Sequence, residues 1–379
     1  MIETEPTTQM FERALPQHLV TKLDRAAKAG LEQAATPGAV VGVRSPEGTW
    51  TKAYGFADPA NLRRMKVGIH TRVGSVTKTF TGTLLLQLDQ EGRLSLDDPI
   101  SKYVAGVPNG DEVTLRHLAN MTSGVASYTA NAAFVDRLFA NPRASFDADE
   151  LIAIGLADSP MFAPGAMFYY SNTNFLLLGK VIEKVTGDRL GQVYRQRIFR
   201  PLGLDDTSWP GTSTALPGPY AKGFTLQGDT ATPSRPANAT HWNPSWGGAA
   251  GAIISNMPDL LTYGRALGTG QGLLRPGAQA ERLQSFPGSS GYGLAMGCVD
   301  GWVGHTGELP GYNTTLFYDT TTDTTVVVQA NSDIASGDCP QSPTLADDPR
   351  RIVCSAPATR IFVALSKALG HTFTPPPMS

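Results

Sequence analysis

The chain has 379 residues, more than the roughly 250 to 300 at which a single hydrophobic core stops growing, so two packed lobes are expected. Hydrophobic residues make up 41% and charged residues 17%, which is typical of a folded protein and excludes a disordered one. The 31 Lys and Arg residues stand against 33 Asp and Glu residues, and a net charge of -2 offers no broad basic surface to nucleic acid.

The sequence contains no pattern for a membrane segment or a signal peptide. Apolar runs such as Phe175 to Leu178 are far shorter than the roughly 20 residues of a spanning helix. The stretch from Met1 to Pro6 is acidic and lacks an apolar region. We therefore predict no transmembrane segment and no signal peptide within the chain as given.

The cysteines indicate an oxidising compartment. Cys339 and Cys354 bracket a Pro- and Asp-rich loop without apolar periodicity, and a disulfide between them would staple that loop. Such a bridge favours an exported protein, periplasmic or extracellular, because cytosolic thiols stay reduced. Cys298 is then interpreted as a small buried hydrophobe.

The chain opens with patterns for a helix and a hairpin. Apolar residues at helical spacing predict a helix over residues 17–35, which a Pro-Gly pair ends. Two β-rich runs, 39–43 and 49–54, flank a turn and predict a hairpin. An antiparallel sheet is therefore expected to begin here.

Helical patterns dominate the middle of the chain. A helix is predicted over residues 75–90, with Gly74 or Ser75 capping its start. Residues 94–204 carry helical patterns broken by Pro and Gly, and few strand patterns. After residue 221 the pattern predicts short strands and one last helix, over residues 251–255, 316–318, 324–330 and 358–369.

This order of elements predicts the α+β class. We expect an antiparallel sheet flanked by the two terminal helices, with a mainly helical lobe inserted. In residue terms, 1–93 and 205–379 would form the sheet lobe and 94–204 the helical lobe.

One set of residues fits covalent hydrolysis of an amide or ester. In Ser75-Val76-Thr77-Lys78 a hydroxyl and an amine are three residues apart, so on a helix their side chains meet. Burial would lower the pKa of Lys78, and a neutral amine can accept the serine proton. Alone this pair is a weak signal, because a capping Ser followed by a solvated Lys gives the same letters. It gains weight from Tyr170-Ser171-Asn172 and His305-Thr306-Gly307 further along the chain.

With these three blocks the chain closely resembles the serine D-alanyl-D-alanine carboxypeptidases related to class C β-lactamases, which share the penicillin-recognising fold. The blocks run from Arg72 to Lys78, from Tyr170 to Phe175 and from Gly304 to Gly307. Similar context extends from about Pro37 to Ala330. The resemblance therefore covers most of the chain.

The resemblance implies a role for each matching residue. Ser75 would be the acylated nucleophile, Lys78 its base or hydrogen-bond partner, and Tyr170 the proton relay to the leaving group. Asn172 would hold the peptide-like group of the substrate. The division of labour between Lys78 and Tyr170 stays open.

The third block would line the substrate. By resemblance, His305, Thr306 and Gly307 form the strand beside the substrate, and the backbone N–H of Glu308 joins that of Ser75 as the oxyanion hole. A serine hydrolase of this kind needs no cofactor. No His, Cys or carboxylate cluster has metal-ligand spacing, and there is no Gly-x-Ser-x-Gly elbow.

The sequence departs from the family pattern where substrate selectivity is decided. No Arg follows Tyr292-Gly293-Leu294-Ala295-Met296, where carboxypeptidase relatives often bind the terminal carboxylate. His305 stands where β-lactamases have Lys, and Glu308 would repel an anionic tail. We therefore predict acyl-enzyme chemistry on neutral or cationic-ended amides and esters.

Several alternatives stay open at this point. The same residues would serve a carboxylesterase, an acyl transferase, or a penicillin sensor whose adduct persists. The partner is expected to be a small-molecule or peptide substrate, and the oligomeric state is left open. His117 is interpreted as a structural residue, whereas Trp242 and Trp246 would line the cleft or belong to the core.

Overall fold

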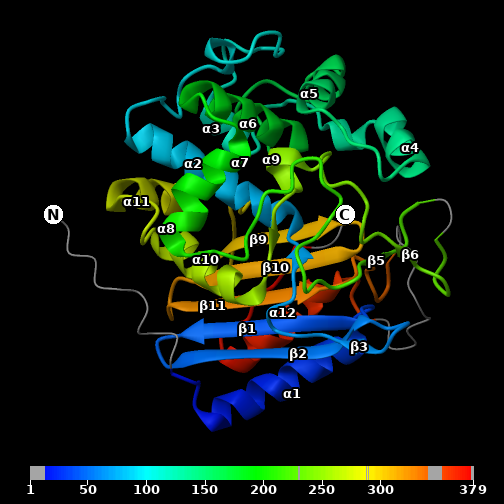
Figure 1. Ribbon diagram of the computed structural model, residues 1–379. Coiled ribbons are helices and arrows are strands. Elements are labelled where there is room, and N and C mark those ends of the chain that lie inside the picture. Colours follow the sequence, from blue (N-terminus) through cyan, green and yellow to red (C-terminus); the bar gives the residue numbers. More distant parts are fainter. Residues whose placement is uncertain (1–12, 229–230, 287, 289, 340–351, 377–379) are drawn as a thin grey trace.

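The computed structural model describes residues 13–228, 231–286, 288, 290–339 and 352–376. Its centre is a seven-stranded antiparallel sheet in the order β3-β2-β1-β11-β10-β9-β8 (Figure 1). The strands are β1 (Gly38–Ser45), β2 (Gly48–Asp58), β3 (Arg63–Arg64), β8 (Gly297–Val299), β9 (Trp302–Leu309), β10 (Tyr312–Asp319) and β11 (Thr324–Ala330). The α+β class and the antiparallel sheet predicted from the sequence are confirmed.

Strands from the two ends of the chain meet in the middle of the sheet. β1 and β11 are antiparallel neighbours, with Ala39 opposite Ala330. The sheet joins its halves there, because β2 and β3 continue from β1 while β10, β9 and β8 continue from β11. The site strand β9 is thus held within a sheet that needs both ends of the chain.

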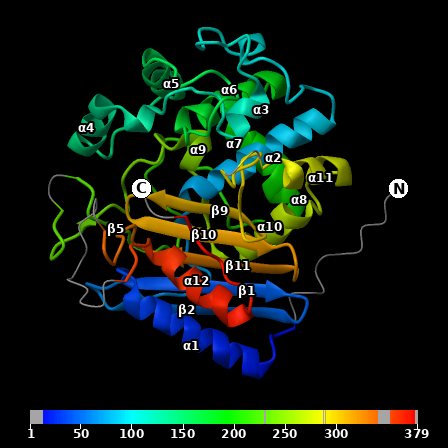
Figure 2. The same ribbon diagram turned by 180° about the vertical axis from the view of Figure 1, so that it is seen from behind.

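Helices from the chain termini cover one face of the sheet. α1 (Gln17–Gln33) and α12 (Pro357–Leu369) lie side by side on it (Figure 2). Leu23 and Phe362 from these helices pack against Val41 and Val328 of the central strands. Burying each such side chain contributes on the order of 1.5–3 kcal/mol, so the terminal helices hold firmly to the sheet.

The other face of the sheet carries the second core. Alternate residues of the same strands, Val40 and Val327, point to this side and join Phe80 of α2 and Leu261 of α10. Because both faces are covered, β11 is buried along its whole length. This side of the sheet supports the helices α2 (Thr77–Gln90), α9 (Gly248–Gly251), α10 (Met257–Thr269) and α11 (Pro276–Gln284).

Residues 94–204, all of which the structure describes, contain helices and no strand. The helices are α3 (Leu115–Ala119), α4 (Ala132–Ala140), α5 (Ala148–Ala157), α6 (Asn172–Thr186), α7 (Leu190–Tyr194) and α8 (Arg200–Leu202). They lie above the sheet in Figure 1. The division into lobes at residues 93 and 205 stays a prediction.

Three expectations about local structure were wrong. The part of the chain after residue 221, predicted to contain short strands and one last helix, also contains the helices α9, α10 and α11. The N-cap of α2 is Val76 and not Gly74 or Ser75. Gly74–Val76 forms one 3₁₀ turn, η2, that leads into the helix. Within residues 251–255 only β7 (Ile254–Ser255) is a strand, pairing with β4 (Thr71–Arg72). A second two-stranded sheet joins β5 (Phe224–Thr225) to β6 (Ala237–Asn238).

The predicted disulfide is present between Cys339 and Cys354. Most of the loop that it closes, residues 340–351, lies outside the described residues, as does the stretch from Met1 to Pro6 on which we predicted no signal peptide. No helix in the described ranges has both the length and the apolar character needed to cross a bilayer. Cys298 is free and half-buried.

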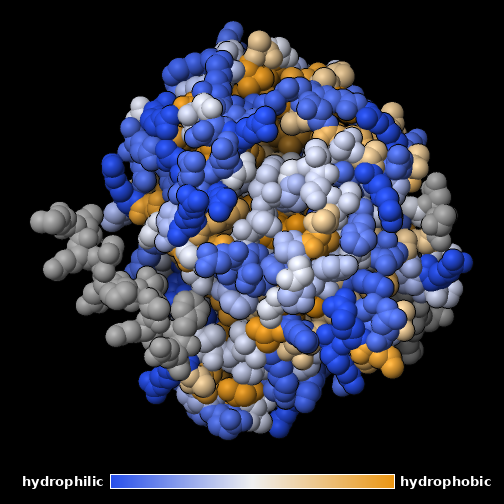
Figure 3. Space-filling model, viewed as in Figure 1, coloured by the Kyte–Doolittle hydropathy of each residue, from blue (hydrophilic) through white to orange (hydrophobic). Residues whose placement is uncertain are grey.

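Polar residues cover most of the face shown in Figure 3. Apolar residues appear on that face as scattered patches among them. Such scattered apolar positions are ordinary on a folded protein and do not by themselves mark a docking surface.

Candidate active site

Ser75 and Lys78 lie one turn apart where η2 leads into α2. Lys78 Nζ is 2.8 Å from Ser75 Oγ and donates to the carbonyl oxygen of Ala250 at 2.9 Å. Ala250 belongs to α9, which packs against α2. The amine is therefore aimed at the hydroxyl by its own helix and by a second helix distant in sequence.

Lys78 is fully buried, with 0% of its side chain exposed. Its Nζ lies 4.8 Å from the centroid of the Tyr170 ring and 5.6 Å from that of Phe175. No carboxylate among the described residues opposes this loss of solvation, so burial lowers the pKa of Lys78 well below its ordinary value of 10.5. The neutral amine, which can accept a proton, is thereby favoured.

Tyr170 and Asn172 stand at the start of α6. Burial raises the pKa of Tyr170, although a hydrogen bond with the Ser75 side chain partly opposes the rise. The Asn172 side chain donates through Nδ2 to Thr129 Oγ1 at 3.0 Å, and its backbone N–H donates to Ser127 Oγ at 3.1 Å. The segment 127–129 therefore fixes the beginning of α6 beside Ser75.

The predicted third block lies on β9, antiparallel to β10. Successive side chains face opposite sides, so His305 is buried whereas Thr306 is exposed. His305 Nδ1 faces the carbonyl oxygen of Thr306, and Nε2 lies 3.0 Å from the hydroxyl of Tyr292. Burial and the nearby Lys78 lower the pKa of His305 to about 3, so the ring is neutral at pH 7. Both of its nitrogens are engaged within the protein.

Two glycines let β9 approach η2 closely. A Cβ on Gly307 would collide with the carbonyl oxygen of Val73 and lie 3.1 Å from the backbone nitrogen of Ser75. A Cβ on Gly74, whose φ is +54°, would collide with the backbone nitrogen of Glu308. The nitrogens of Ser75 and Glu308 are therefore close neighbours, as an oxyanion hole requires.

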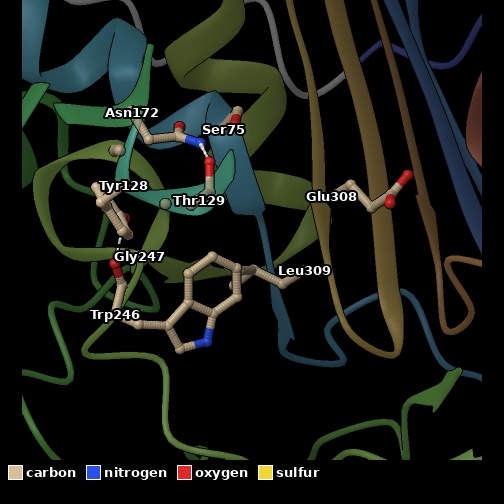
Figure 4. A pocket seen from close by; sticks show the side chains of 10 residues that line it. Ser75, Tyr128, Thr129, Asn172, Trp246, Gly247, Glu308 and Leu309 are labelled. Carbon is tan, nitrogen blue, oxygen red and sulfur yellow. Dashed lines mark hydrogen bonds between the residues drawn. The ribbon is translucent and has the colours of Figure 1, made fainter. Parts of the chain in front are cut away.

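A pocket of about 160 Å³ opens beside Ser75 (Figure 4). Tyr128, Trp246 and Leu309 supply most of its apolar wall, and Asn172 lies at its edge. The Tyr128 hydroxyl donates to the carbonyl oxygen of Trp246, which joins two sides of the wall. The volume is close to that of a cavity of roughly 150 Å³ that binds benzene.

Glu308 lines the same pocket, but its carboxylate points away from Ser75 and the Trp246 ring (Figure 4). The side chain is exposed at the rim. The protein around it and the negative charge of Asp333 raise the pKa of the Glu308 carboxyl. Asp333 is itself buried and accepts hydrogen bonds from Thr225 at 2.8 Å and Gln227 at 2.6 Å. Two carboxyl groups therefore stand at this end of the site.

The structure gathers the predicted residues at one place. Ser75, Lys78 and Tyr170 are in mutual contact, and Asn172 and Glu308 line the pocket next to Ser75. His305 differs from the expectation, because it faces the interior and offers no free nitrogen to a substrate. Thr306 and Gly307 lie on the same strand.

Sequence reasoning left some residues of the site undecided and missed others. Trp246 lines the pocket, whereas Trp242 packs against Phe139 at 6.0 Å between ring centroids. His117 is structural, as predicted, since its Nδ1 accepts from the Thr114 backbone in a capping box. The pocket residue Tyr128 and its neighbour Thr129 were missed. They follow the family-like Thr-Ser-Gly segment at residues 122–124, and that adjacency was the available signal.

The site contains no arrangement suited to a metal. In the part of the chain that the structure describes, no group of three or more His, Cys, Asp or Glu side chains is placed to hold an ion. The chemistry offered by Ser75, Lys78 and Tyr170 is that of a nucleophile, a base and a proton relay.

Solved structures of two hydrolases are similar to this chain. The D-stereospecific amidohydrolase from Streptomyces sp. has 35% identity and a TM-score of 0.75, over 83% of this chain and 94% of that chain. The D-amino acid amidase from Ochrobactrum anthropi SV3, solved with D-phenylalanine, has 25% identity and a TM-score of 0.77, over 93% of this chain and 99% of that chain.

A curated relative is also named as a hydrolase. A D-aminopeptidase from Cereibacter sphaeroides is 29% identical over 323 residues, which is 83% of this chain and 60% of the relative. The chain thus spans about three fifths of that protein's length. A model of the Beta-lactamase family matches residues 23–346. The chain therefore belongs to the beta-lactamase family.

Proposed function

We propose that the protein hydrolyses amides and esters of D-amino acids that lack an anionic tail, through an acyl-enzyme on Ser75. The observation that carries this proposal is the contact of 2.8 Å between Ser75 Oγ and Lys78 Nζ, a fully buried amine with no carboxylate partner in the ranges that the structure describes. Burial lowers the pKa of the amine and so favours the neutral form, which can act as the base that a serine nucleophile requires.

In the acylation step Ser75 Oγ attacks the substrate carbonyl carbon and its proton passes to Lys78 Nζ. The developing oxyanion accepts hydrogen bonds from the backbone N–H groups of Ser75 and Glu308. Tyr170 gives its proton to the leaving nitrogen or oxygen and regains one from Lys78. The scissile bond breaks and the acyl group remains on Ser75.

Lys78 is the better candidate than Tyr170 for the base. Burial favours the neutral form of both groups, because it lowers the pKa of Lys78 and raises that of Tyr170. A phenolate beside an ammonium would put two charges into the same buried site. In deacylation the neutral amine takes a proton from the water that attacks the acyl carbon. The bond between Ser75 Oγ and that carbon then breaks, the proton passes from Lys78 to Ser75 Oγ, and the carboxylic acid leaves.

The walls of the site favour a particular acyl group. The pocket formed by Tyr128, Trp246 and Leu309 suits an apolar side chain about as large as one aromatic ring. Its rim carries Glu308, and Asp333 stands nearby, so a substrate carboxylate would be repelled there. The D configuration is proposed from the names of the similar amidohydrolase, amidase and aminopeptidase.

A steady-state comparison of substrates tests this proposal. We expect D-phenylalaninamide and its p-nitroanilide to be turned over in preference to the L enantiomers, to a D-Ala-D-Ala peptide and to a chromogenic cephalosporin. A clear preference for the D-Ala-D-Ala peptide would overturn the substrate class. Intact mass spectrometry over time separates turnover from a persistent adduct, which would indicate a sensor.

A fluorophosphonate probe tests the residues themselves. Labelling should be lost in Ser75→Ala and fall by about 10² to 10⁴ in rate in Lys78→Ala, the usual contribution of a general base. Lys28→Ala is the matched control, because Lys28 is an exposed residue paired with Asp24 on α1. Unchanged labelling of Ser75→Ala would refute the assignment of the nucleophile.

A further inference from the structure

Tyr292 is a buried phenol beside the site for which the proposed mechanism has no role. Its side chain is 6% exposed, and it precedes β8 in a tight loop. The Cys298 N–H donates to the Gly291 carbonyl at 2.6 Å and the Gly293 N–H donates to that of Met296 at 2.8 Å. The backbone on both sides of Tyr292 is therefore fixed, and so is the direction of its ring.

The hydroxyl of Tyr292 is 3.0 Å from His305 Nε2. The other ring nitrogen, Nδ1, faces the carbonyl oxygen of Thr306, which can only accept a hydrogen bond. Nδ1 must therefore carry the hydrogen, and in the neutral ring Nε2 keeps a lone pair. Tyr292 donates its O–H to that lone pair, since burial raises its pKa well above the ordinary value and the phenol keeps its proton.

Tyr292 also contacts the proposed proton relay. Its ring lies edge-on to Tyr170 at 6.1 Å and 85°, and edge-on to His305 at 5.6 Å and 88°. The rings of Tyr170 and His305 are 6.2 Å apart. The Tyr292 ring thus packs against both Tyr170 and His305, and its hydroxyl donates to the only nitrogen of His305 that has a lone pair.

We propose that Tyr292 is a positioning residue that holds His305 in its Nδ1–H tautomer and so leaves Lys78 as the sole free base beside Ser75. With Nε2 filled, His305 cannot draw the Tyr170 hydroxyl away from Ser75. It also does not take up a proton and place a second cation near Lys78. The part of this proposal that concerns catalysis rests on the proposed function, whereas the tautomer of His305 does not.

The titratable groups that face the His305 ring come from three other segments. They are Lys78 on α2, Tyr170 before α6 and Tyr292 before β8. On β9 itself, Glu308 is titratable, and its carboxylate is directed away from Ser75 (Figure 4). Loss of the Tyr292 hydroxyl frees the Nε2 lone pair, so the pKa of His305 should rise, although burial and Lys78 still lower it.

The test is Tyr292→Phe, which keeps the ring and removes only the hydroxyl. We expect kcat/KM for a D-amino acid amide at pH 7 to fall by about tenfold, the effect of roughly one net hydrogen bond. The acid limb of the pH profile, which Lys78 sets in the wild-type protein, should also move upward, because His305 then titrates beside Lys78 and its protonated form is inactive. Tyr194→Phe is the matched control, since it removes a buried hydroxyl that contacts Thr81 at 2.6 Å in the helical region.

A double-variant cycle separates positioning from packing. If Tyr292 acts through His305, then Tyr292→Phe should have little further effect in a His305→Asn background. A purely structural role predicts additive losses and a pH profile that does not move. Either of those results would overturn the proposal.

Nitrogen-15 NMR of the imidazole gives a readout that does not need activity. The wild-type protein should show the neutral Nδ1–H form of His305 down to about pH 5, and Tyr292→Phe should titrate at higher pH. Identical ring shifts and titration in the two proteins would sink the proposal even if the enzyme is active. If the enzyme turns over no D-amino acid amide, the proposed function fails, yet this NMR comparison still decides the tautomer.

Discussion

At the scale of single residues, the central feature is an amine whose pKa is lowered by burial, so that its neutral form is favoured. Lys78 has no carboxylate partner among the described residues, and the carbonyl of Ala250 accepts only one of its hydrogens. The structure therefore favours the neutral amine by excluding water from it, and directs it with two hydrogen-bond contacts. A partnered lysine would remain charged and would be useless as a base.

The pH dependence of kcat/KM follows from the directions in which the pKa values of Lys78 and Tyr170 are shifted. Since the pKa of Lys78 is lowered well below 10.5, the neutral amine is present above that lowered value and is lost as the pH falls through it. Since the pKa of Tyr170 is raised, its proton remains to serve the leaving group well into the alkaline range. We expect kcat/KM to rise as the pH passes through this lowered pKa and to reach a plateau well below pH 10.5. A rate still climbing near pH 10 would contradict the assignment of Lys78 as base.

Glu308 gives a second prediction at the residue scale. Above the raised pKa of the Glu308 carboxyl, where the group is charged, Glu308→Gln should raise kcat/KM for a D-Ala-D-Ala peptide relative to a D-amino acid amide by about fivefold, as expected for loss of roughly 1 kcal/mol of repulsion in water. Glu47→Gln, in the exposed turn between β1 and β2, is the control. An unchanged ratio of the two substrates would show that the carboxylate at the rim does not select against anions.

At the scale of elements, the site depends on how closely β9 approaches η2. The strand can lie against the turn because Gly307 and Gly74 present no side chain at the crossing. This contact brings together the N–H groups of Ser75 and Glu308, which belong to segments more than two hundred residues apart. A pair of short-range motifs is thus made into one site by a backbone contact.

Gly307→Ala tests that contact. The new methyl group would meet the Val73 carbonyl, so β9 must shift away from η2 and the two N–H groups must separate. We expect kcat to fall by about 10² to 10³, the loss typical of one oxyanion-hole donor, with KM changed less. Gly277→Ala on α11 is the control, because no atom lies within 4 Å of a Cβ there. Full kcat in Gly307→Ala would rule out this oxyanion hole.

The sequence allowed the prediction of those elements whose apolar residues repeat regularly. The terminal helices, the first hairpin and β11 follow such patterns, and so does α2. The predicted start of α2 was wrong because the sequence around Ser75 is compatible both with a 3₁₀ turn and with a capped α-helix. The partners of His305 could not be foreseen, since Tyr292 meets it through a fold that no local spacing encodes.

At the scale of the whole molecule, the disulfide stabilises the end of the chain that carries α12. Cys339 and Cys354 are separated by 15 residues, and Arg360 of α12 donates to the carbonyl oxygens of Ser336 and Val353 on either side of the bridge. Arg360 therefore joins the segments next to both cysteines to the helix that covers one face of the sheet.

Removing the bridge should lower stability without affecting chemistry. In the double variant Cys339→Ser/Cys354→Ser we expect the free energy of unfolding to fall by up to about 3 kcal/mol, the chain-entropy value for a closed loop of roughly 15 residues. The midpoint of denaturant unfolding measures this, and kcat/KM should stay unchanged. Reducing the wild type should reproduce the loss, whereas a reductant that destabilises the double variant further would point to another cause.

The pairing of Ala39 with Ala330 fixes the moment at which the molecule gains its activity. During synthesis β1, which contains Ala39, leaves the ribosome long before β11 has been made. The sheet therefore cannot form completely until β11 has been synthesised. Ser75 and Lys78 emerge early as well, but the strand that supplies the second N–H donor begins only at Trp302. In the growing polypeptide Ser75 therefore lacks its second N–H donor, and we expect the protein to become active only after β9 has been synthesised.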